Sequence, residues 1–360
     1  MKIMLNGATA GTNFGDYLFA EVFQNYIGKK IGSSNVYWYK SRFAYSDFFK
    51  KNLNNNNKCK LQELNGLVYI SGGYFCGDDH TFRDYIYRFL RYFLIGYRFI
   101  ITKKPYAIIG LEVGKSKSKV MNTIQKTILK HSSIIIVRNQ ESFDAVKQIG
   151  VDNVICTADT VFAFEDNFFE KYQIPDNISR YNGKILLLHI NSCIEQNRII
   201  KSKIVPIINT FLERHPEYAV LLATDQYSEY QKEAEEDVAS LLKADNILYY
   251  MYDKPFELCK IISLSDVIVT TKLHVGIVGA KLGKSVISFS GHSEKIKRLY
   301  SQLNEDERTI SLNDLTYEKG VALIEKYYNK SIQVDHNVIS LAKQNFKYLD
   351  EFLDSLTSNA

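Results

Sequence analysis

The stretch that decides the fold is residues 265–295, SDVIVTTKLHVGIVGAKLGKSVISFSGHSEK. It predicts a buried strand over 265–270, a helix of small residues over 275–282 and a second strand over 285–290. Where the first strand gives way to the helix, backbone N–H groups and the positive end of the helix dipole are exposed. Lys272 and His274 stand at that junction. The segment therefore predicts a parallel α/β unit with an anion site beside a titratable imidazole.

The same alternation continues along the chain. Apolar runs of strand length separated by helical patterns are typical of parallel sheets covered on both faces. The predicted strands are residues 2–6, 67–71, 106–110, 133–137, 153–157, 184–189, 219–223, 247–250, 267–270 and 285–290. The predicted helices are residues 16–28, 82–99, 119–131, 142–150, 198–214, 229–242, 255–264 and 275–282.

A polar, turn-forming stretch over residues 163–182 separates the two halves of this pattern. A length of 360 residues also favours about two domains. We therefore predict an α/β protein of two doubly wound, Rossmann-like domains that face a cleft, over residues 1–170 and 171–334. Ligands of such sheets bind beyond the carboxyl ends of the strands, where polar and glycine residues of this chain gather.

Composition narrows the classes of function. With 45 basic and 40 acidic residues and a net charge of +5, the chain gives no reason to infer nucleic-acid binding. Its five cysteines form no Cys-x-x-Cys pair, which indicates buried thiols in a reducing compartment and neither a disulfide framework nor a zinc site. The sequence contains no signal peptide and no apolar run of 18 residues, so we expect a cytoplasmic protein.

Several short motifs resemble, in their order and spacing, those of the polysaccharide pyruvyl transferase family. Lys272-Leu273-His274 followed by Lys295 is similar to that family's Arg-Leu-His triplet and later Lys, with Lys272 in place of the usual Arg. The other matches, which together cover roughly residues 3–300, are Asn13-Phe14-Gly15-Asp16, Gly72-Gly73, Gly110-Leu111-Glu112-Val113-Gly114, Arg138-Asn139-Gln140-Glu141-Ser142 and Ala158-Asp159.

The resemblance implies a transferase that moves pyruvyl from phosphoenolpyruvate to a sugar of a cell-surface or exopolysaccharide, forming a pyruvate ketal without metal or cofactor. It implies a layout similar to the GT-B architecture, with an acceptor side in the first domain and a donor side in the second. The acceptor would be a lipid-linked or polymeric saccharide. A helix over 335–356, within a C-terminal segment 335–360, is expected to pack back across both domains, as in that architecture.

The resemblance also assigns roles to particular residues. His274 is the candidate general acid and Asp159 a candidate base. The expected donor contacts are Leu111, Arg138, Ser142, Lys272 and Lys295. The expected acceptor contacts are Asn13, Asp16 and Gly73.

Each candidate has a structural alternative. Arg138, at the end of a predicted strand, suits bidentate binding of phosphate or carboxylate, but it could instead form a surface ion pair with Glu141 or Asp144. Asp16 could cap the first helix, and Asp159 could cap the turn that follows it. His274 could be a structural histidine at a helix N-terminus, and Lys295 a solvated helix residue.

Residues 82–104, FRDYIYRFLRYFLIGYRFIITKK, combine aromatic and basic side chains with a single acid. An amphipathic helix packed on the sheet is one interpretation. The other is a helix that binds an anionic membrane surface, which would place the protein peripherally at the inner face of the cell membrane.

Two other functions stay open at this level. A GT-B-type glycosyltransferase that uses a nucleotide sugar would share the architecture, and Glu305, Asp306 or Glu307 would then bind ribose hydroxyls. A non-catalytic relative that binds an anionic glycan is the second alternative, and Lys272 in place of Arg leaves room for it.

Overall fold

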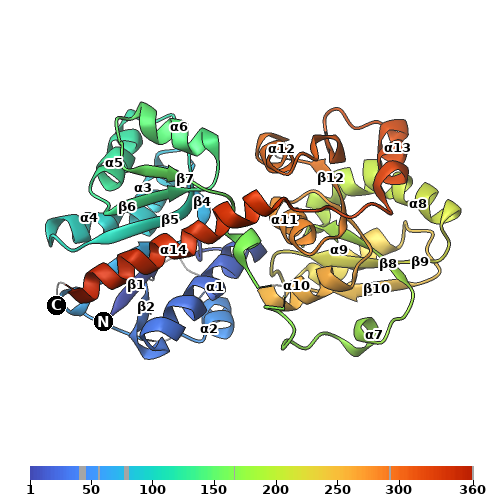
Figure 1. Ribbon diagram of the computed structural model, residues 1–360. Helices are drawn as coiled ribbons and strands as arrows, with labels where there is room; N and C mark the ends of the chain where they lie inside the picture. The colour runs from blue at the N-terminus through green and yellow to red at the C-terminus, as the bar shows by residue number, and fades with distance from the viewer. Residues whose placement is uncertain (40–45, 56, 77–80, 166, 292, 359–360) are drawn as a thin grey trace. The chain divides into compact units, whose positions relative to one another are not determined.

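In the computed structural model, which describes residues 1–360 except 40–45, 56, 77–80, 166, 292 and 359–360, the chain divides into two compact domains (Figure 1). The first domain comprises Met1–Thr12, Asp16–Ala163 and Ile339–Ala360. The second comprises Asn13–Gly15 and Phe164–Val338. The short segment Asn13–Gly15 in the second domain was not expected from the sequence.

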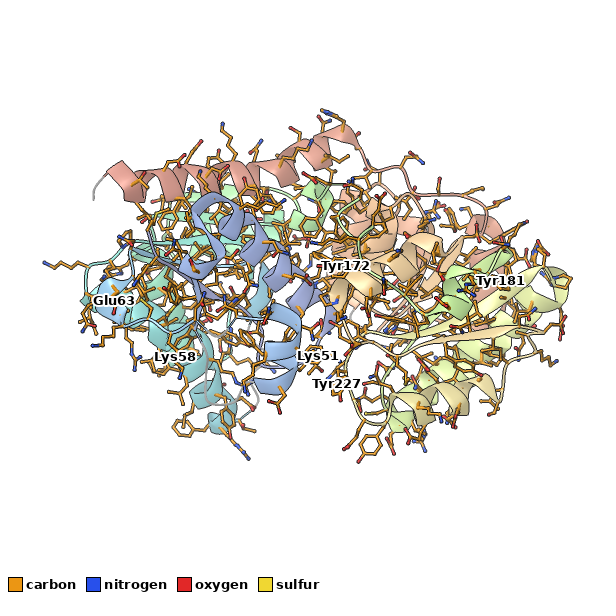
Figure 2. All side chains as sticks on the ribbon, turned by 90° about the horizontal axis from the view of Figure 1, so that it is seen from below. Lys51, Lys58, Glu63, Tyr172, Tyr181 and Tyr227 are labelled. Atoms are coloured by element: carbon orange, nitrogen blue, oxygen red, sulfur yellow. The ribbon has the colours of Figure 1, made fainter. Side chains whose placement is uncertain are left out.

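The segment that joins the two halves belongs to the second domain because of its packing. The rings of Phe168 and Tyr172 lie 5.5 and 4.9 Å from that of Phe256. Nζ of Lys260 donates a hydrogen bond of 2.7 Å to the carbonyl of Tyr172, which is labelled in Figure 2. These contacts explain why the second domain begins at Phe164, before the boundary at residue 170 that the sequence suggested.

The first domain is built on a fully parallel sheet in the order β2-β1-β3-β5-β6-β7, with β4 paired beside β5. Its strands are β1 (Ile3–Asn6), β2 (Val36–Trp38), β3 (Gly66–Tyr69), β4 (Gly72–Phe75), β5 (Tyr106–Val113), β6 (Ile134–Val137) and β7 (Val154–Cys156). Its helices are α1 (Phe14–Ile31), α2 (Ser46–Leu53), α3 (Phe82–Arg88), α4 (Leu94–Ile101), α5 (Lys119–Lys130) and α6 (Gln140–Gln148).

Helices cover both faces of this sheet, so β5 is buried along its whole length (Figure 1). One face packs on α4, α5 and α6 in a core that includes Phe99, Leu129 and Val146. The C-terminal helix α14 (His336–Ser358) belongs to this domain from Ile339 onward. Its end packs beside Gly66, where an added β-carbon would lie 2.7 Å from Leu356.

The second domain has a parallel sheet in the order β10-β9-β8-β11-β12-β13. Its strands are β8 (Lys184–Ile190), β9 (Tyr218–Thr224), β10 (Ile247–Tyr250), β11 (Val267–Thr270), β12 (Ser285–Ser290) and β13 (Thr309–Ser311). Its helices are α7 (Asp176–Ser179), α8 (Val205–Arg214), α9 (Gln231–Ala239), α10 (Pro255–Leu264), α11 (Leu273–Lys281), α12 (Ser293–Gln302) and α13 (Tyr317–Tyr327). Val267 and Val269 share a core with α8 and α13, whereas Ile268 packs against Gly279 of α11 on the opposite face.

The fold predicted from the sequence is confirmed: both domains are parallel α/β units, and every predicted strand is present. Strands β2 and β13, of three residues each, were not predicted. Strand β4 was missed because it opens with Gly72 and Gly73, and paired glycines indicate a turn more often than a strand.

Residues 82–101 form one helical run in which a π-helical turn, Phe89–Phe93, joins α3 to α4. Arg88 is only 7% exposed, and its Nε donates a hydrogen bond of 3.3 Å to the carbonyl of Tyr74. Arg88 therefore does not contribute to an exposed basic surface of this run. Phe82, Ile86 and Ile101 are exposed. No helix in the described residues is both long and apolar enough to cross a membrane.

Candidate functional site

The strand order of the second domain reverses between β8 and β11. From β8 the sheet grows outward through β9 to β10, and from β11 it grows the other way through β12 to β13. In open parallel sheets, the crevice outside the carboxyl ends of the strands at such a reversal is where ligands bind. The residues that end β8, β9 and β11 therefore form the candidate site.

The N-terminus of α11 lies at this reversal because α11 begins almost directly after β11. Lys272 is its N-cap residue, with an extended backbone (φ −115°, ψ 142°), and the Lys272 side chain makes no capping hydrogen bond. Oγ1 of Thr270 accepts a hydrogen bond of 3.0 Å from the Lys272 N–H and so fixes the turn. A helix start of this kind presents N–H donors and positive potential to an anion. Lys272 is 32% exposed and His274 is half-buried.

Asp225 follows β9 and carries a buried carboxylate into the same site. Its Oδ1 lies 3.1 Å from Nε2 of His189 in β8 and 3.9 Å from Nζ of Lys272. Asp225 is 3% exposed and His189 1%. Burial by itself raises the pKa of Asp225, but His189, Lys272 and His274 together outweigh burial and bring that pKa below its usual value.

A network of uncharged groups fixes the end of β9. Oγ1 of Thr224 donates to Oε1 of Gln231 at 2.5 Å and accepts from the N–H of Tyr252 at 2.9 Å. Nε2 of Gln231 donates to the carbonyl of Tyr252 at 3.3 Å. Because all three residues are buried, the backbone of Asp225 has a defined position. The loop beyond it reaches the surface at Tyr227, which is 46% exposed and labelled in Figure 2.

The segment Asn13–Gly15 packs against this loop within the second domain. The N–H of Phe14 donates a hydrogen bond of 2.8 Å to the carbonyl of Asp225, and Asn13 forms an antiparallel bridge with Gln226. The Phe14 ring meets that of Tyr252 edge-on at 6.1 Å. The early Asn-x-Gly-Asp motif therefore begins in the same domain as the Lys-Leu-His triplet.

Gly15 stands directly against His274. A β-carbon on Gly15 would lie 2.1 Å from Cγ and Nδ1 of the imidazole. This distance is too short for a real contact, so the position has room only for glycine. Oδ1 of Asn13 accepts a hydrogen bond of 3.0 Å from the Gly15 N–H. Asn13 thus makes a capping hydrogen bond at the start of α1, and Asp16 lies in the first turn of that helix.

Arg138 sits in a buried cluster at the carboxyl edge of the first sheet. Its guanidinium donates to Glu112 at 2.5 Å and to Asp159 at 2.9 Å, and all three residues are at most 6% exposed. Burial alone lowers the pKa of Arg138, but the two carboxylates overcome this effect and raise it above its usual value. The alternative of a surface ion pair with Glu141 or Asp144 is therefore wrong.

Glu112 reaches Arg138 because of an irregularity in β5. The pairing of β5 with β6 shifts register between Ile108 and Leu111, and Gly110 there adopts φ +67°. A β-carbon on Gly110 would lie 2.3 Å from Oγ of Ser71, so the position needs glycine both for space and for backbone conformation. Such bulges commonly re-aim a side chain beside a functional site.

Leu111, Ser142 and Asp159, three other predicted site residues, take part in the packing and hydrogen bonding of the first domain. Leu111 is fully buried in the core, and Oγ of the buried Ser142 accepts a hydrogen bond of 3.0 Å from the Val113 N–H. Oδ1 of Asp159 accepts from the Val161 N–H at 3.1 Å, which confirms the capping role considered for it.

Three further predicted residues lie at the edges of their elements. Asp16 is in the first turn of α1, Gly73 is in β4, and Lys295 is in the first turn of α12. All three are half-buried.

Three charged or titratable residues of these clusters, His189, Asp225 and Glu112, were not predicted from the sequence. A signal existed for two of them: His189 and Asp225 are polar residues that end or follow apolar strands, as do Lys272 and His274. In the described residues, no group of three or more His, Cys, Asp or Glu side chains could hold a metal ion.

Comparison with solved structures identifies the class of fold. The UDP-N-acetylglucosamine 2-epimerase of Neisseria meningitidis, bound to UDP-GlcNAc, is 13% identical, with a TM-score of 0.61 over 98% of this chain and all of that chain. A putative enzyme of the same name from Listeria monocytogenes is 10% identical, with a TM-score of 0.65 over 98% and 97% of the two chains. At such identities the likeness shows a common fold and nothing about ligands. MurG of Acinetobacter baumannii is also similar, at 9% identity, with a TM-score of 0.50 over 90% and 89%.

Comparison with protein families identifies the chain more closely. The polysaccharide pyruvyl transferase family matches residues 13–293, which span most of the chain and reach from the Asn-x-Gly-Asp motif to the start of α12. The chain belongs to the polysaccharide pyruvyl transferase family. The comparison with curated proteins found no match.

Proposed function

We propose that the protein transfers the pyruvyl unit of phosphoenolpyruvate onto two hydroxyl groups of a saccharide, producing a pyruvate ketal and inorganic phosphate. The observation that carries this proposal is the arrangement at the reversal of the second sheet, where Lys272 and His274 share the N-terminus of α11. Membership of the family supplies the class of reaction.

The donor site needs several positive groups because phosphoenolpyruvate carries a phosphate and a carboxylate. We assign them to Lys272, to the first N–H groups of α11 and to Lys295 in the first turn of α12. Lys272 acts here as a compact point charge, whereas the family's usual Arg would bind an oxyanion with two parallel hydrogen bonds. With lysine at this position in place of arginine, the site should discriminate less among anions of different shape but should still attract them electrostatically.

The proposed chemistry begins with proton transfer. His274, as imidazolium, donates its proton to the methylene carbon of phosphoenolpyruvate, and positive charge develops at the carbon that bears the phosphate oxygen. A sugar hydroxyl attacks that carbon and loses its proton to a base. A second hydroxyl then displaces phosphate. Of the two protons that the diol loses, one replaces the proton given by His274 and the other leaves with phosphate.

The acceptor is assigned to the segment that contains Asn13 and Asp16, together with Gly73 in β4. Support comes from the position of Gly15, which lies between Asn13 and Asp16 and touches the imidazole of His274. A saccharide hydroxyl bound at Asn13–Gly15, within the second domain, would lie near the acid. Asp16, half-buried in the first turn of α1, is the carboxylate on this segment that suits a base.

The roles proposed for Arg138 and Asp159 depend on how their cluster is charged. One guanidinium with two carboxylates is formally negative, so a donor anion would have to displace Glu112 or Asp159 to reach Arg138. We therefore propose that Arg138, with Leu111 and Ser142, shapes the edge of the first sheet for the donor, and that Asp159 acts as a base only if Arg138 releases it.

The alternative of a nucleotide-sugar enzyme depended on acids that could bind ribose. Glu305 binds Nε of Arg308 at 2.7 Å, and Asp306 accepts a hydrogen bond from Ser301. Glu307 accepts from the hydroxyl of Tyr327 at 2.8 Å. Because each acid already has a partner, these residues give the alternative little support.

The proposal is tested by incubating the purified protein with phosphoenolpyruvate and a panel of diol-bearing saccharides, and measuring phosphate release together with acid-labile pyruvate on the glycan. His274→Gln should lower turnover about 10² to 10⁴-fold, whereas the exposed His131→Gln should not change it. Phosphoenolpyruvate should also raise the melting temperature by mass action. Protection by nucleotide sugars alone would favour the glycosyltransferase, and glycan binding without turnover would favour a non-catalytic relative.

A further inference from the structure

His189 and Asp225 are buried, titratable and without a role in the reaction described above. Keeping a carboxylate away from water is costly unless other groups compensate its charge. Here the compensating groups come from two directions: His189 from β8, at 3.1 Å, and Lys272 from the start of α11, at 3.9 Å. The pair lies at the carboxyl edge of the sheet and not in its middle, so stability of the core does not explain it.

Asp225 contacts the candidate site in two ways. Its backbone carbonyl accepts the hydrogen bond from Phe14 that holds Asn13–Gly15, and Gly15 in turn bounds the imidazole of His274. Its carboxylate interacts electrostatically with His274 itself. One residue therefore helps to fix where the imidazole lies and favours positive charge on it.

A charge problem at the site shows why such a residue is needed. A general acid must hold its proton before the reaction, so His274 must be an imidazolium at working pH. Two features of its surroundings oppose that state: the N-terminus of α11 carries the positive end of a helix dipole, and Lys272, the N-cap residue, is a cation. An acid in this position needs a negative charge close by, and Asp225 supplies it.

We propose that Asp225, held in place by His189, is the positioning residue that keeps His274 protonated and oriented for proton donation. The electrostatic part of this proposal does not depend on the substrate, whereas the catalytic consequence rests on the proposed function. Asp225 is not a catalytic residue in this scheme because it acts through His274.

The groups that face Asp225 in the described part of the chain are few. His189 comes from β8, and Lys272 and His274 come from the start of α11. The segment Asn13–Gly15 and the network of Thr224, Gln231 and Tyr252 contribute no charge. A change of charge at Asp225 should therefore be felt mainly by these three residues.

The test measures the protonation of His274 directly. Long-range ¹H–¹⁵N correlation spectra of the full chain, labelled at histidine nitrogen, are recorded against pH, with the His274 and His189 signals assigned from His274→Gln and His189→Gln. Asp225→Asn is isosteric and removes the charge. It should lower the pKa of His274 by about one unit. Asp245→Asn, at an exposed acid of the same domain, is the control and should leave the titration unchanged.

Two variants of His189 test whether this residue positions the Asp225 carboxylate or only stabilises the fold. His189→Leu removes the nearest partner of the Asp225 carboxylate, so the carboxylate should lose its fixed position and the titration of His274 should differ from that of wild type. His189→Gln keeps an N–H donor in reach of the carboxylate and should restore most of the wild-type titration. If Asp225→Asn does not give a dispersed spectrum, Asp225→Ser replaces it in the same comparison.

The results that would overturn this inference differ from those that would overturn the proposed function. A His274 titration that is the same in wild type, Asp225→Asn and His189→Leu overturns the inference, even if the wild type consumes phosphoenolpyruvate. A shifted titration in a protein that neither binds nor consumes phosphoenolpyruvate supports the inference and defeats the proposed function. Where the wild type is active, Asp225→Asn should move the alkaline limb of the kcat profile to lower pH by the same amount as the titration.

Discussion

The backbone of Gly15 lies against the imidazole of His274, so closely that a β-carbon on Gly15 would stand 2.1 Å from the ring. The two residues are far apart in sequence and belong to different motifs. Because Asn13–Gly15 belongs to the second domain, the contact is internal to that domain. Gly15, in the early motif, therefore has to be glycine because His274, in the late motif, occupies the space that a side chain would need.

Replacing Gly15 by alanine should disturb His274 specifically. The new methyl group overlaps the ring, so Gly15→Ala should cost about 1–3 kcal/mol of stability or drive the imidazole from its place. Gly11→Ala is the matched control, because a β-carbon there meets nothing within 4 Å. Melting temperatures and turnover should both separate the two variants.

A double variant sharpens this prediction. His274→Ala removes the atoms that Gly15→Ala would strike, so the second substitution should cost little stability in the His274→Ala background. If Gly15→Ala and Gly11→Ala behave alike in both backgrounds, the contact between Gly15 and His274 is not present in solution.

Arg138 should contribute strongly to stability because its removal would strand two buried carboxylates. Breaking a buried pair of this kind typically costs about 3–5 kcal/mol, so Arg138→Met should lower the free energy of unfolding by this amount. Arg98→Met, at an exposed arginine of the same domain, should have little effect. Urea unfolding of the two variants makes the comparison.

A triple variant identifies the cause. Adding Glu112→Gln and Asp159→Asn to Arg138→Met removes the stranded charges and should recover part of the lost stability. If Arg138→Met keeps wild-type stability and loses only the binding of phosphoenolpyruvate, Arg138 is a donor cation whose contacts with Glu112 and Asp159 are incidental.

Much of the fold could be predicted from the sequence because parallel α/β domains have simple, local signals. A run such as Ile134–Val137 is apolar along its whole length, since helices cover both faces of the sheet. Such runs show that a strand exists, but they do not show which strands pair with it in the sheet. The strand order, and with it the reversal between β8 and β11, depends on long-range pairing and became known only from the structure.

The site was harder to predict because its residues come from separate strand ends. Lys272 and His274 were predicted, since they share one helix start. The partners of Arg138 were not, because Glu112 reaches it through a bulge at Gly110 that no local pattern reveals. Asp225 looked like an ordinary loop acid, and its importance follows from four neighbours that lie elsewhere in the sequence: Phe14, His189, Lys272 and His274.

Glu235 should make the second domain less stable as the pH rises. It is 2% exposed, its Oε1 has no hydrogen-bond partner within the described residues, and burial raises its pKa to about 8. The unfolded chain has the ordinary glutamate pKa of about 4.3, so between the two values the folded state binds more protons. Its contribution to stability is fully present below pH about 4.3 and is lost as the pH rises to about 8.

Glu235→Gln removes this proton linkage. The variant should melt at nearly the same temperature as wild type near pH 5 and at a higher temperature near pH 8, with a difference on the order of a few kcal/mol in stability. Glu233→Gln, at an exposed acid of the same helix, should leave the pH dependence of the melting temperature unchanged. Parallel curves for wild type and Glu235→Gln would mean that the carboxyl group is hydrated.

Peripheral membrane contact through residues 82–104 remains a prediction, and the structure changes the residues that test it. Arg88 is buried, so the exposed basic residues of this run are Arg83, Arg98 and Lys103, beside the exposed apolar Phe82, Ile86 and Ile101. Each basic residue near an anionic surface contributes about 1 kcal/mol, and the attraction fades within a Debye length. Arg83→Glu with Arg98→Glu should abolish co-sedimentation with anionic vesicles at low salt, whereas Lys232→Glu with Lys243→Glu, an equal charge change on the second domain, should not. Equal recovery of both variants, or equal binding to neutral vesicles, would leave the run as a helix that only packs on its sheet.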